Sequence, residues 1–370
     1  MKNKRFGVIF SGGTAAGMNA TLEYLCRYSY LAGAELIGFK YGWKGLIENN
    51  VINITLTSTL GIGLEAGGTY LGACSKVNVF NHEGNNYSEL CYKNYKARRL
   101  DAIFVLGGDG SNRQANELNE KFPDMKFIWI SATLDRDVMG CDDTIGFHTA
   151  YENAATVIAS MAKDGTTMNR HTIVECMGRH SGFVTAYAVD RALREYRDIK
   201  INMVLVPEVT FDIGTICDSF KQARDPMNIV ISEGIVLDEK SPVDAEKRIV
   251  GHHQALANTC KKLAAILQPF SKLPIKTSIV GYLQRTGNLS STDVFLAEHC
   301  AKIAVENAVK KGDSMAIVFV NGAFKAIKMK ELVKQNENAG KEKIKKFLQD
   351  PVVSVIQDQL SAGAFNKVLI

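Results

Sequence analysis

The feature that most constrains the fold is a regular alternation of short apolar runs with longer segments of helical spacing. Strands that alternate with helices form α/β folds with a largely parallel sheet. The apolar runs lie at Phe6–Phe10, Ala102–Leu106, Phe127–Ile130, Thr172–Cys176, Met203–Val206, Ile229–Ile231, Ser278–Val280 and Ala316–Val320. The helical segments lie at Asn19–Ala32, Asn112–Phe122, Thr149–Lys163, Ser181–Arg194, Leu256–Leu267 and Asp293–Lys310.

Several of these apolar runs end directly in a turn that contains glycine. In open α/β sheets, ligands bind at the carboxyl ends of the strands. We therefore expect these turns to face one cleft. The turns are Ser11–Gly13, Gly107–Gly110, Met177–Arg179 and Ser232–Gly234.

The composition narrows the class of protein. The chain has 370 residues, 46% hydrophobic and 22% charged, which predicts two or three globular domains and excludes disorder, collagen and coiled coil. The net charge of +5 is mild and evenly spread, so it argues against nucleic acid as a partner and suits anionic small molecules. No apolar run approaches the roughly 20 residues of a membrane helix. The apolar stretch Phe6–Phe10 is too short for a signal peptide.

The eight cysteines are at least 17 residues apart, and no CxxC or zinc-binding spacing occurs. A structural metal is therefore not expected. Scattered single cysteines are typical of reduced core residues, which predicts a cytoplasmic protein.

Two glycine-rich turns are candidates for phosphate binding. The segment Ser11–Asn19 follows a strand and opens a helix, where free N–H groups attract anions, although a tight structural turn is the alternative. In Gly107–Ser111, three glycines surround Asp109 with nearly bare backbone. Such a carboxylate suits Mg²⁺ held against a polyphosphate, because Mg²⁺ is usually bound by few protein oxygens.

A third turn, Ser131–Asp137, carries two carboxylates around Arg136. One carboxylate of such a pair can take a proton from an attacking hydroxyl while the other orients a neighbour or a metal. A surface turn with an ion pair is the alternative.

Together these turns resemble the phosphofructokinase family, because nine motifs occur in the family's order between about Phe6 and Ala301. A lone GGDG also occurs in lipid and NAD kinases, which lack the other motifs. The motifs are SGGxxxGMNA, GGTxLG, GGDGS, TxDxD, DxTIGFxTA, VECMGRxSG, VPE, SEG and GxxQRxG.

The resemblance implies two similar α/β domains with mostly parallel sheets and the active site in the cleft between them. Residues 1–147 with about 284–334 would bind nucleotide and Mg²⁺, and residues 148–283 with about 335–370 would bind the sugar phosphate. The polar segment Lys328–Lys345 is expected to be a solvated helix and loop.

The implied activity is the glycolytic transfer of a phosphoryl group from ATP, with Mg²⁺, to the 1-hydroxyl of fructose 6-phosphate, which yields fructose 1,6-bisphosphate. Family members share the active site between subunits, which implies a homo-oligomer, a tetramer or a dimer. The implied partners are a sugar phosphate and a nucleotide, with neither nucleic acid nor a membrane.

The resemblance also implies residue roles. Asp135 resembles the base that deprotonates the sugar hydroxyl, Asp137 its supporting carboxylate, and Asp109 the Mg²⁺ ligand. The implied catalytic residues are Asp135, Asp137, Thr133 and Arg179, with Thr133 against the transferred phosphoryl group. The implied nucleotide-binding residues are Gly13, Gly108, Asp109, Gly110, Ser111 and Lys76. The implied sugar-phosphate-binding residues are Arg170 (from a neighbouring subunit), Met177, Gly178, Glu233, Lys276, Tyr282 and Arg285.

The chain departs from the family pattern at several positions. Ser75 replaces an arginine that reaches the transferring phosphates, with Lys76 beside it as a substitute. Arg136 replaces an asparagine, and it either supplies the missing cation or forms an ion pair that silences one carboxylate. The other departures are Thr14, Ala16, Glu23 (with Arg27 retained as a possible effector arginine), Lys276 and Tyr282.

The phosphoryl donor is argued from three positions. Diphosphate-using members carry Asp and Lys where this chain has Gly110 and Ala132, so the pattern favours ATP. Gln114 argues against ATP, because it replaces a glycine near the nucleotide. A diphosphate donor, another sugar phosphate such as sedoheptulose 7-phosphate, and a non-catalytic regulatory subunit remain alternatives.

Overall fold

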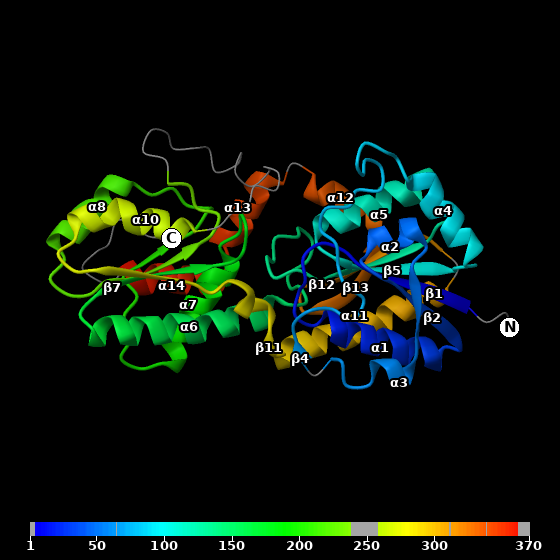
Figure 1. Ribbon diagram of the computed structural model, residues 1–370, viewed down its shortest axis with the longest axis horizontal. Coiled ribbons are helices and arrows are strands. Elements are labelled where there is room, and N and C mark those ends of the chain that lie inside the picture. Colours follow the sequence, from blue (N-terminus) through cyan, green and yellow to red (C-terminus); the bar gives the residue numbers. More distant parts are fainter. Residues whose placement is uncertain (1–3, 64, 238–257, 311, 338, 362–370) are drawn as a thin grey trace. The chain divides into compact units, whose positions relative to one another are not determined.

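The computed structural model describes residues 4–63, 65–237, 258–310, 312–337 and 339–361 (Figure 1). The chain divides into two compact units. Unit 1 comprises Met1–Thr149 and Arg285–Glu337, and unit 2 comprises Ala150–Gln284 and Asn338–Ile370. Each unit is therefore built from two separate stretches of sequence.

The main sheet of unit 1 has seven strands in the order β13-β12-β6-β5-β1-β2-β3. The five inner strands are parallel, and the edge strands β3 and β13 are antiparallel to their neighbours. A two-stranded antiparallel ribbon joins β4 to β11. The strands are β1 (Lys4–Phe10), β2 (Ala34–Phe39), β3 (Val51–Ile54), β4 (Glu65–Ala66), β5 (Ala102–Gly107), β6 (Phe127–Ser131), β11 (Gly287–Asn288), β12 (Met315–Val320) and β13 (Ala323–Lys328).

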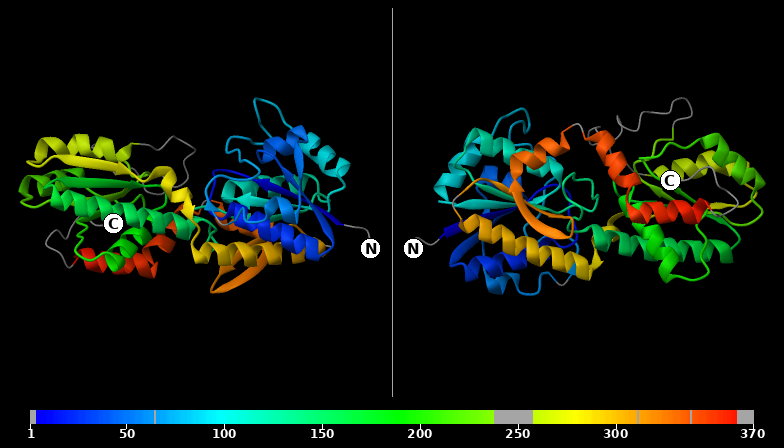
Figure 2. Two further views of the ribbon diagram at one scale, coloured as in Figure 1. Left: turned by 60° about the horizontal axis from the view of Figure 1, so that its bottom comes forward. Right: turned by 180° about the vertical axis from the view of Figure 1, so that it is seen from behind.

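Helices cover both faces of this sheet, because side chains along each buried strand alternate between the faces. On one face Phe6 and Val8 of β1 pack with residues of α1 and α11, which lie side by side in Figure 2. On the other face Ile9 packs in a core with residues of α5 and α12. The helices are α1 (Met18–Leu31), α2 (Trp43–Glu48), α3 (Leu56–Thr59), α4 (Ser88–Ala97), α5 (Asp109–Lys121), α11 (Ser291–Val309) and α12 (Met329–Asn336).

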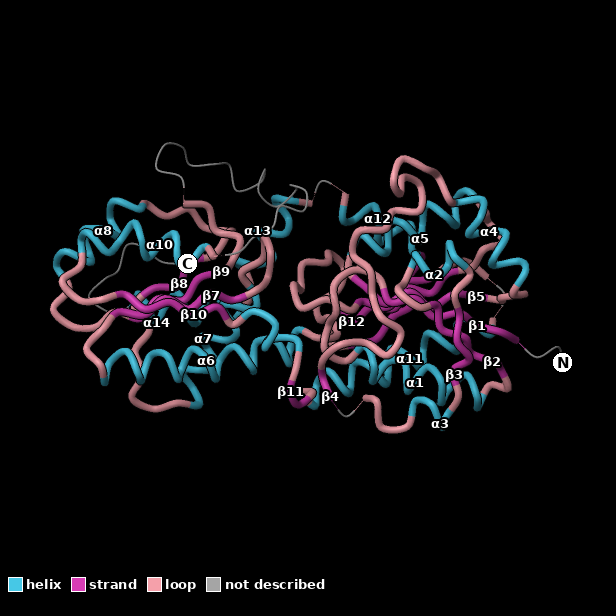
Figure 3. Tube along the Cα trace, in the orientation of Figure 1, coloured by secondary structure: helices cyan, strands magenta, loops and turns pink. Residues whose placement is uncertain are grey.

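Unit 2 contains a parallel sheet of four strands in the order β10-β7-β9-β8. In Figure 3, α8 and α10 lie on one face of this sheet, while α6 and α7 lie on the other. The strands are β7 (His171–Cys176), β8 (Met203–Leu205), β9 (Asn228–Ser232) and β10 (Ile275–Ile279). The helices are α6 (Phe147–Thr167, which begins in unit 1), α7 (Phe183–Glu195), α8 (Ile213–Gln222), α10 (Thr259–Leu267), α13 (Gly340–Leu348), α14 (Pro351–Ser361), and the 3-10 turns η1 (Gln268–Phe270) and η2 (Gly281–Arg285).

The structure confirms the predicted α/β class with mostly parallel sheets. The segment Lys328–Lys345 departs from the expected solvated helix and loop, because most of it lies in α12 and α13. In α12 the side chains of Met329, Leu332 and Val333 are buried. No helix in the part of the chain that the structure describes is long and apolar enough to cross a membrane.

Candidate active site

The three turns predicted to bind phosphate and move protons lie at one edge of the sheet in unit 1. They follow β1, β5 and β6, which are parallel neighbours. The backbone N–H of Ser11 donates to the carbonyl of Leu106 at 2.8 Å, and that of Ala132 donates to Gly107 at 3.1 Å. The three turns are therefore bonded to one another through the main chain.

Two serines and a tryptophan fix the first two turns together. Trp43 Nε1 donates to Ser11 Oγ at 2.7 Å, and Ser111 Oγ donates to the same oxygen at 2.7 Å. Trp43 is 1% exposed, so this bond is shielded from water. The turn that begins at Ser11 was predicted to bind phosphate, but Trp43 was not identified from the sequence, because only the folded chain brings it to this turn.

Asp109 is the first residue of α5, where the partial positive charge of the helix N-terminus favours a carboxylate. Arg113 Nη2 lies 3.0 Å from Asp109 Oδ2. This pair was missed in the sequence, although the four-residue spacing of opposite charges on a helix is a recognisable signal.

The surroundings of Asp109 fit a magnesium ion bound largely through phosphate. No group of three or more His, Cys, Asp or Glu side chains that could hold a metal occurs among the described residues, so Asp109 would supply a single protein ligand. A Cβ added to Gly110 would have no atom within 4 Å. The space beside the carboxylate is therefore open to a ligand.

The turn Ser131–Asp137, called here the aspartate loop, is held in shape by hydrogen bonds to Thr133. The N–H of Asp135 donates to Thr133 Oγ1 at 3.2 Å, and Thr144 Oγ1 donates to the carbonyl of Thr133 at 2.6 Å. Thr133 Cβ also lies 3.8 Å from the position that a Cβ on Gly108 would occupy. Thr133 thus brings Asp135, which is 8% exposed, next to the turn that carries Asp109.

Arg136 is held by the segment that follows this loop. Its Nε donates to the carbonyl of Asp142 at 2.7 Å, and its guanidinium carbon lies 5.0 Å from the centre of the Phe147 ring. Its φ is 53°, in the left-handed region that residues other than glycine and asparagine rarely adopt. Through these contacts the side chain of Arg136 connects the aspartate loop to Asp142 and to Phe147, the first residue of α6.

Lys76 lies on a segment attached to the first phosphate turn. Ser11 and Cys74 form a parallel backbone bridge, and the N–H of Gly12 donates to the carbonyl of Cys74 at 3.4 Å. Further along, the N–H of Val79 donates to Gln114 Oε1 at 3.3 Å. Lys76 is exposed between these two attachments.

In unit 2, Glu233 organises the turn that follows β7. Its Oε1 accepts hydrogen bonds from the N–H groups of Gly178 at 3.2 Å and Arg179 at 2.9 Å. The N–H of Met177 donates to Gln284 Oε1 at 2.7 Å. The structure therefore brings three of the expected sugar-phosphate-binding residues, Met177, Gly178 and Glu233, together with the expected catalytic residue Arg179 at the carboxyl ends of β7 and β9.

The remaining sugar-side residues are more dispersed. Lys276 is exposed on the edge strand β10, and Tyr282 is 78% exposed in η2. Arg170 forms an ion pair with Asp164 of the same chain. Arg285 is grouped with unit 1, where its Nη1 donates to the carbonyl of Thr14.

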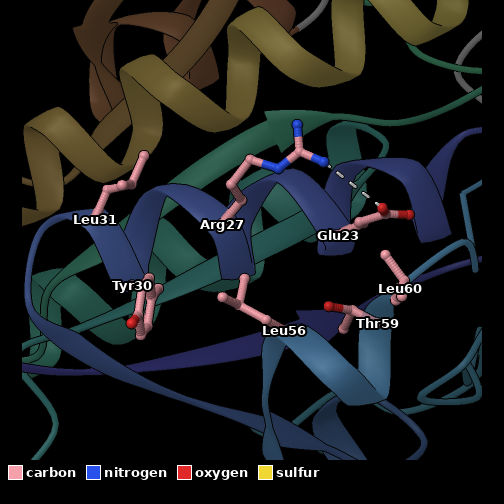
Figure 4. Close-up of a pocket in the computed structure, with 7 residues that line it drawn as sticks. All are labelled: Glu23, Arg27, Tyr30, Leu31, Leu56, Thr59 and Leu60. Atoms are coloured by element: carbon pink, nitrogen blue, oxygen red, sulfur yellow. Dashed lines mark ion pairs between the residues drawn. The ribbon is translucent and has the colours of Figure 1, made fainter.

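A pocket of about 330 Å³ lies between α1 and α3 in unit 1 (Figure 4). It contains the Arg27–Glu23 pair, whose Nη2 and Oε1 atoms are 3.9 Å apart. None of the residues expected in the active site lines this pocket. Its lining residues are Glu23, Arg27, Tyr30, Leu31, Leu56, Thr59 and Leu60.

Comparison with known proteins identifies relatives over most of the chain. The family model described as Phosphofructokinase matches residues 5–347. An ATP-dependent 6-phosphofructokinase of Persephonella marina is 28% identical over 327 residues, covering 86% of this chain and 90% of the relative. A pyrophosphate–fructose 6-phosphate 1-phosphotransferase of Dictyoglomus thermophilum is 29% identical over 339 residues, covering 90% of this chain and 92% of the relative.

The solved structures agree at the level of the fold. Phosphofructokinase of Pichia pastoris in the T-state superimposes with a TM-score of 0.79 at 20% identity. The match covers 98% of this chain but only 39% of the yeast chain.

Proposed function

The chain belongs to the phosphofructokinase family, and from that premise we propose that it transfers the γ-phosphoryl group of ATP to the 1-hydroxyl of fructose 6-phosphate. Unit 1 would bind the nucleotide and Mg²⁺, and unit 2 would bind the sugar phosphate. This assignment follows the chemistry of the turns at the edge of each sheet.

The observation that carries the choice of ATP is the open space at Gly110. A nucleotide needs room for its α-phosphate, and no atom lies within 4 Å of the position that a side chain would occupy there. Gln114 is compatible with ATP as the donor, because its Oε1 accepts a hydrogen bond from the N–H of Val79, on the segment that also carries Lys76. Diphosphate is the second candidate, since a relative of similar identity is named as a diphosphate-using enzyme.

Phosphoryl transfer depends on positioning and charge neutralisation more than on covalent chemistry. Mg²⁺, when bound, would neutralise charge on the donor phosphates, and Asp109 is the residue that would hold it. Asp135 would accept the proton of the sugar 1-hydroxyl, with Thr133 fixing its backbone at 3.2 Å and Asp137 supporting it. Gly13 and Gly108 would present backbone N–H donors to the phosphates, and Ser111, whose hydroxyl donates to Ser11 Oγ, would hold the two phosphate turns together.

The sugar phosphate would be held by charged and polar groups of unit 2. Glu233 would bind sugar hydroxyls while its Oε1 keeps the turn of Gly178 and Arg179 in place. Lys276 and Tyr282 would replace the family's arginine and histidine, so the pocket would keep a positive charge.

The proposed assembly is a homo-oligomer, a tetramer or a dimer, in the cytoplasm. Its basis is Arg170, which by motif position would reach the sugar phosphate of a neighbouring subunit. The Arg170–Asp164 ion pair would then have to open or share its charge when the substrate binds.

A coupled assay with fructose 6-phosphate and Mg²⁺ tests this function by comparing ATP with diphosphate. We expect ATP-dependent turnover of about 1–100 s⁻¹. We expect Asp135→Asn to lower kcat by about 10²–10⁴-fold with little change in the KM for fructose 6-phosphate.

Other outcomes identify the alternatives. Turnover with diphosphate alone would overturn the donor, and turnover with sedoheptulose 7-phosphate alone would overturn the acceptor. Binding of both ligands without turnover would indicate a non-catalytic regulatory subunit.

A further inference from the structure

A chain of two hydrogen bonds links Trp43, Ser11 and Ser111. Trp43 Nε1 and Ser111 Oγ each lie 2.7 Å from Ser11 Oγ, and both donate to it. Trp43 is 1% exposed, Ser11 5% and Ser111 6%, so water has little access to these bonds. All three residues belong to unit 1, and Ser11 begins the first phosphate turn.

The hydrogens in this chain outnumber its hydrogen bonds. An indole N–H can only donate, so Ser11 Oγ accepts from Trp43. Two serine hydroxyls add two hydrogens, which makes three hydrogens for two bonds. Because Ser111 also donates to Ser11, both lone pairs of Ser11 Oγ accept, and its own hydrogen is left over. Neither hydroxyl has a further hydrogen-bond partner among the residues that the structure describes.

The leftover hydrogen needs an acceptor, but the nearby backbone offers donors. The N–H groups of Gly13 and Gly108, in the turns that carry the two serines, donate to no group in the described part of the chain. Hydroxyl and N–H donors on adjacent turns are typical of a site for an anion such as phosphate. Ser11 Oγ can only donate to such a ligand. It cannot ligate Mg²⁺ as the hydroxyl of a P-loop does, because both of its lone pairs are engaged.

Two glycines let the backbone segments approach closely enough for these bonds. A Cβ on Gly107 would lie 2.5 Å from the carbonyl oxygen of Ser11, and a Cβ on Gly42 would meet the carbonyl oxygen of Phe10. Both obstacles are backbone atoms, which cannot swing aside as the end of a flexible side chain can. The two glycines therefore bring the starts of α5 and α2 against the end of β1.

We propose that Ser11 binds a phosphate of the phosphoryl donor through its hydroxyl, and that Trp43 is the residue that positions this hydroxyl. The two hydrogen bonds that Ser11 Oγ accepts leave one direction for its hydrogen, which a phosphate oxygen would receive. The inference rests on the proposed function and deepens it. ATP and diphosphate share this phosphate chemistry, so the role is the same for either donor.

Calorimetric binding to Ser11→Ala tests the role of the hydroxyl without requiring turnover. The ligands are a non-hydrolysable ATP analogue with Mg²⁺, diphosphate with Mg²⁺, and fructose 6-phosphate, each titrated separately. We expect the phosphoryl donor to bind about tenfold or more weakly, since a hydrogen bond to a charged group is lost, and fructose 6-phosphate to stay within about twofold of wild type. Unchanged binding of the phosphoryl donor would overturn the proposal.

Ser111→Ala separates the two hydroxyls. It removes one hydrogen bond to Ser11 but keeps the bond from Trp43 and the hydrogen of Ser11, so we expect a smaller loss of affinity than in Ser11→Ala. A larger loss in Ser111→Ala would overturn the assignment to Ser11, because the bonds would then run from Trp43 through Ser11 to Ser111.

Trp43→Phe and Trp129→Phe form a matched pair for the positioning role. Both tryptophans are buried in the same core of unit 1, but Trp129 Nε1 has no hydrogen-bond partner in the part of the chain that the structure describes. Each substitution keeps an aromatic ring and removes an indole N–H, so the two variants share the loss of packing. We expect Trp43→Phe to weaken binding of the phosphoryl donor about threefold or more, and Trp129→Phe to leave it within about twofold. Equal effects would overturn the role of Trp43.

Nuclear magnetic resonance gives a readout on the unsubstituted chain. The chain has two tryptophans, so tryptophan labelled with ¹⁵N gives two indole N–H signals, which Trp43→Phe assigns. When Ser11 donates to a phosphate, its oxygen becomes a stronger acceptor, so we expect the Trp43 proton to move downfield and the Trp129 proton to stay. An unmoved Trp43 signal at saturation would overturn this inference alone. Failure of wild type to bind either the ATP analogue or diphosphate would overturn the proposed function with it.

Discussion

At the scale of single residues, Arg136 combines an unfavourable backbone with favourable side-chain contacts. Its left-handed φ of 53° costs about 1–2 kcal/mol in a residue with a Cβ. Its hydrogen bond to the carbonyl of Asp142 and its contact with the Phe147 ring together stabilise the folded state by about 1–2.5 kcal/mol. The two effects nearly balance, so substitutions that separate them are informative.

Arg136→Met keeps the backbone cost and loses both contacts, so we expect the free energy of unfolding to fall by about 1–2.5 kcal/mol. Arg136→Asn loses the same contacts but tolerates the left-handed conformation, so it should remain within about 1 kcal/mol of wild type. Urea unfolding of both variants measures the difference. Equal losses would show that the backbone of Arg136 is not strained.

The turnover of Arg136→Asn separates the two interpretations of this position. A lower kcat would indicate that the guanidinium contributes positive charge to the transferring phosphates. A higher kcat would indicate that it restrains one of the carboxylates.

His171 makes the stability of unit 2 depend on pH. Its side chain is 1% exposed, its Nδ1 accepts a hydrogen bond from the N–H of Met227 at 2.8 Å, and burial lowers its pKa below 6.5. The folded state keeps the ring neutral, whereas the unfolded chain binds a proton near pH 6.5. The stabilisation is therefore complete above pH 6.5 and is lost as the pH falls below it.

We expect the free energy of unfolding of wild type to fall as the pH falls from 7 to 5.5, with a slope of at most one proton, about 1.4 kcal/mol per pH unit. His171→Gln cannot take up this proton and should show a shallower dependence over the same range. Equal slopes in the two proteins would rule out His171 as the titrating group.

At the scale of elements, one buried carboxylate joins the starts of α6 and α11. Asp293 accepts hydrogen bonds from the N–H of Gly146 at 2.7 Å, and from the N–H and hydroxyl of Thr149 at 2.8 and 2.6 Å. It is fully buried, and burial raises the pKa of its carboxyl. Because Gly146 packs against Ala15 and Ala16, this junction also supports the first phosphate turn.

Asp293→Ala would leave several buried donors without an acceptor, and we expect it to lower the free energy of unfolding by about 3 kcal/mol or more. Asp293→Asn keeps one acceptor oxygen and removes the buried charge, so its loss should be less than half as large. Urea unfolding at pH 7.5 tests whether stability decreases from wild type to Asp293→Asn to Asp293→Ala. If the asparagine variant were the less stable of the two, the charge itself would be the stabilising feature.

In the main sheet of unit 1, strands that form buried apolar runs were predicted from the sequence. The strands missed there are either interrupted by a polar residue or lie at the edge of the sheet. β5 and β6 are buried throughout and were found as apolar runs. β2 was missed because Glu35 and Gly38 interrupt its apolar residues. β13 was also missed, although Asn321 and Gly322, both with positive φ, form the dipeptide typical of a hairpin turn.

The sequence predicted which turns form the candidate site, but it did not predict the side-chain contacts between them. The alternation of strands and helices places the turns after β1, β5 and β6 at one edge, which brings Asp109 and Asp135 together. The positions of Arg285 and Trp43 depend on pairing between segments far apart in the sequence. No local pattern encodes such contacts.

At the scale of the whole molecule, the two units carry different candidate ligands, and hydrogen exchange can test that division. A non-hydrolysable ATP analogue with Mg²⁺ should slow exchange in residues 107–113, and fructose 6-phosphate should slow it in residues 177–182. At about 100 times Kd the stabilisation of the bound state is about 2.7 kcal/mol. Protection of residues 107–113 by fructose 6-phosphate alone would contradict the division.

The order of strands in unit 1 has a consequence for synthesis of the chain. β6 ends at Ser131, but its neighbour β12 and the covering helix α11 begin at Met315 and Ser291. At about 5–20 residues per second, a ribosome needs roughly 10–30 s to pass from β6 to α11. During that interval the apolar surface that α11 later covers is exposed to solvent. The nascent chain is therefore a candidate client for chaperones that bind at the ribosomal exit.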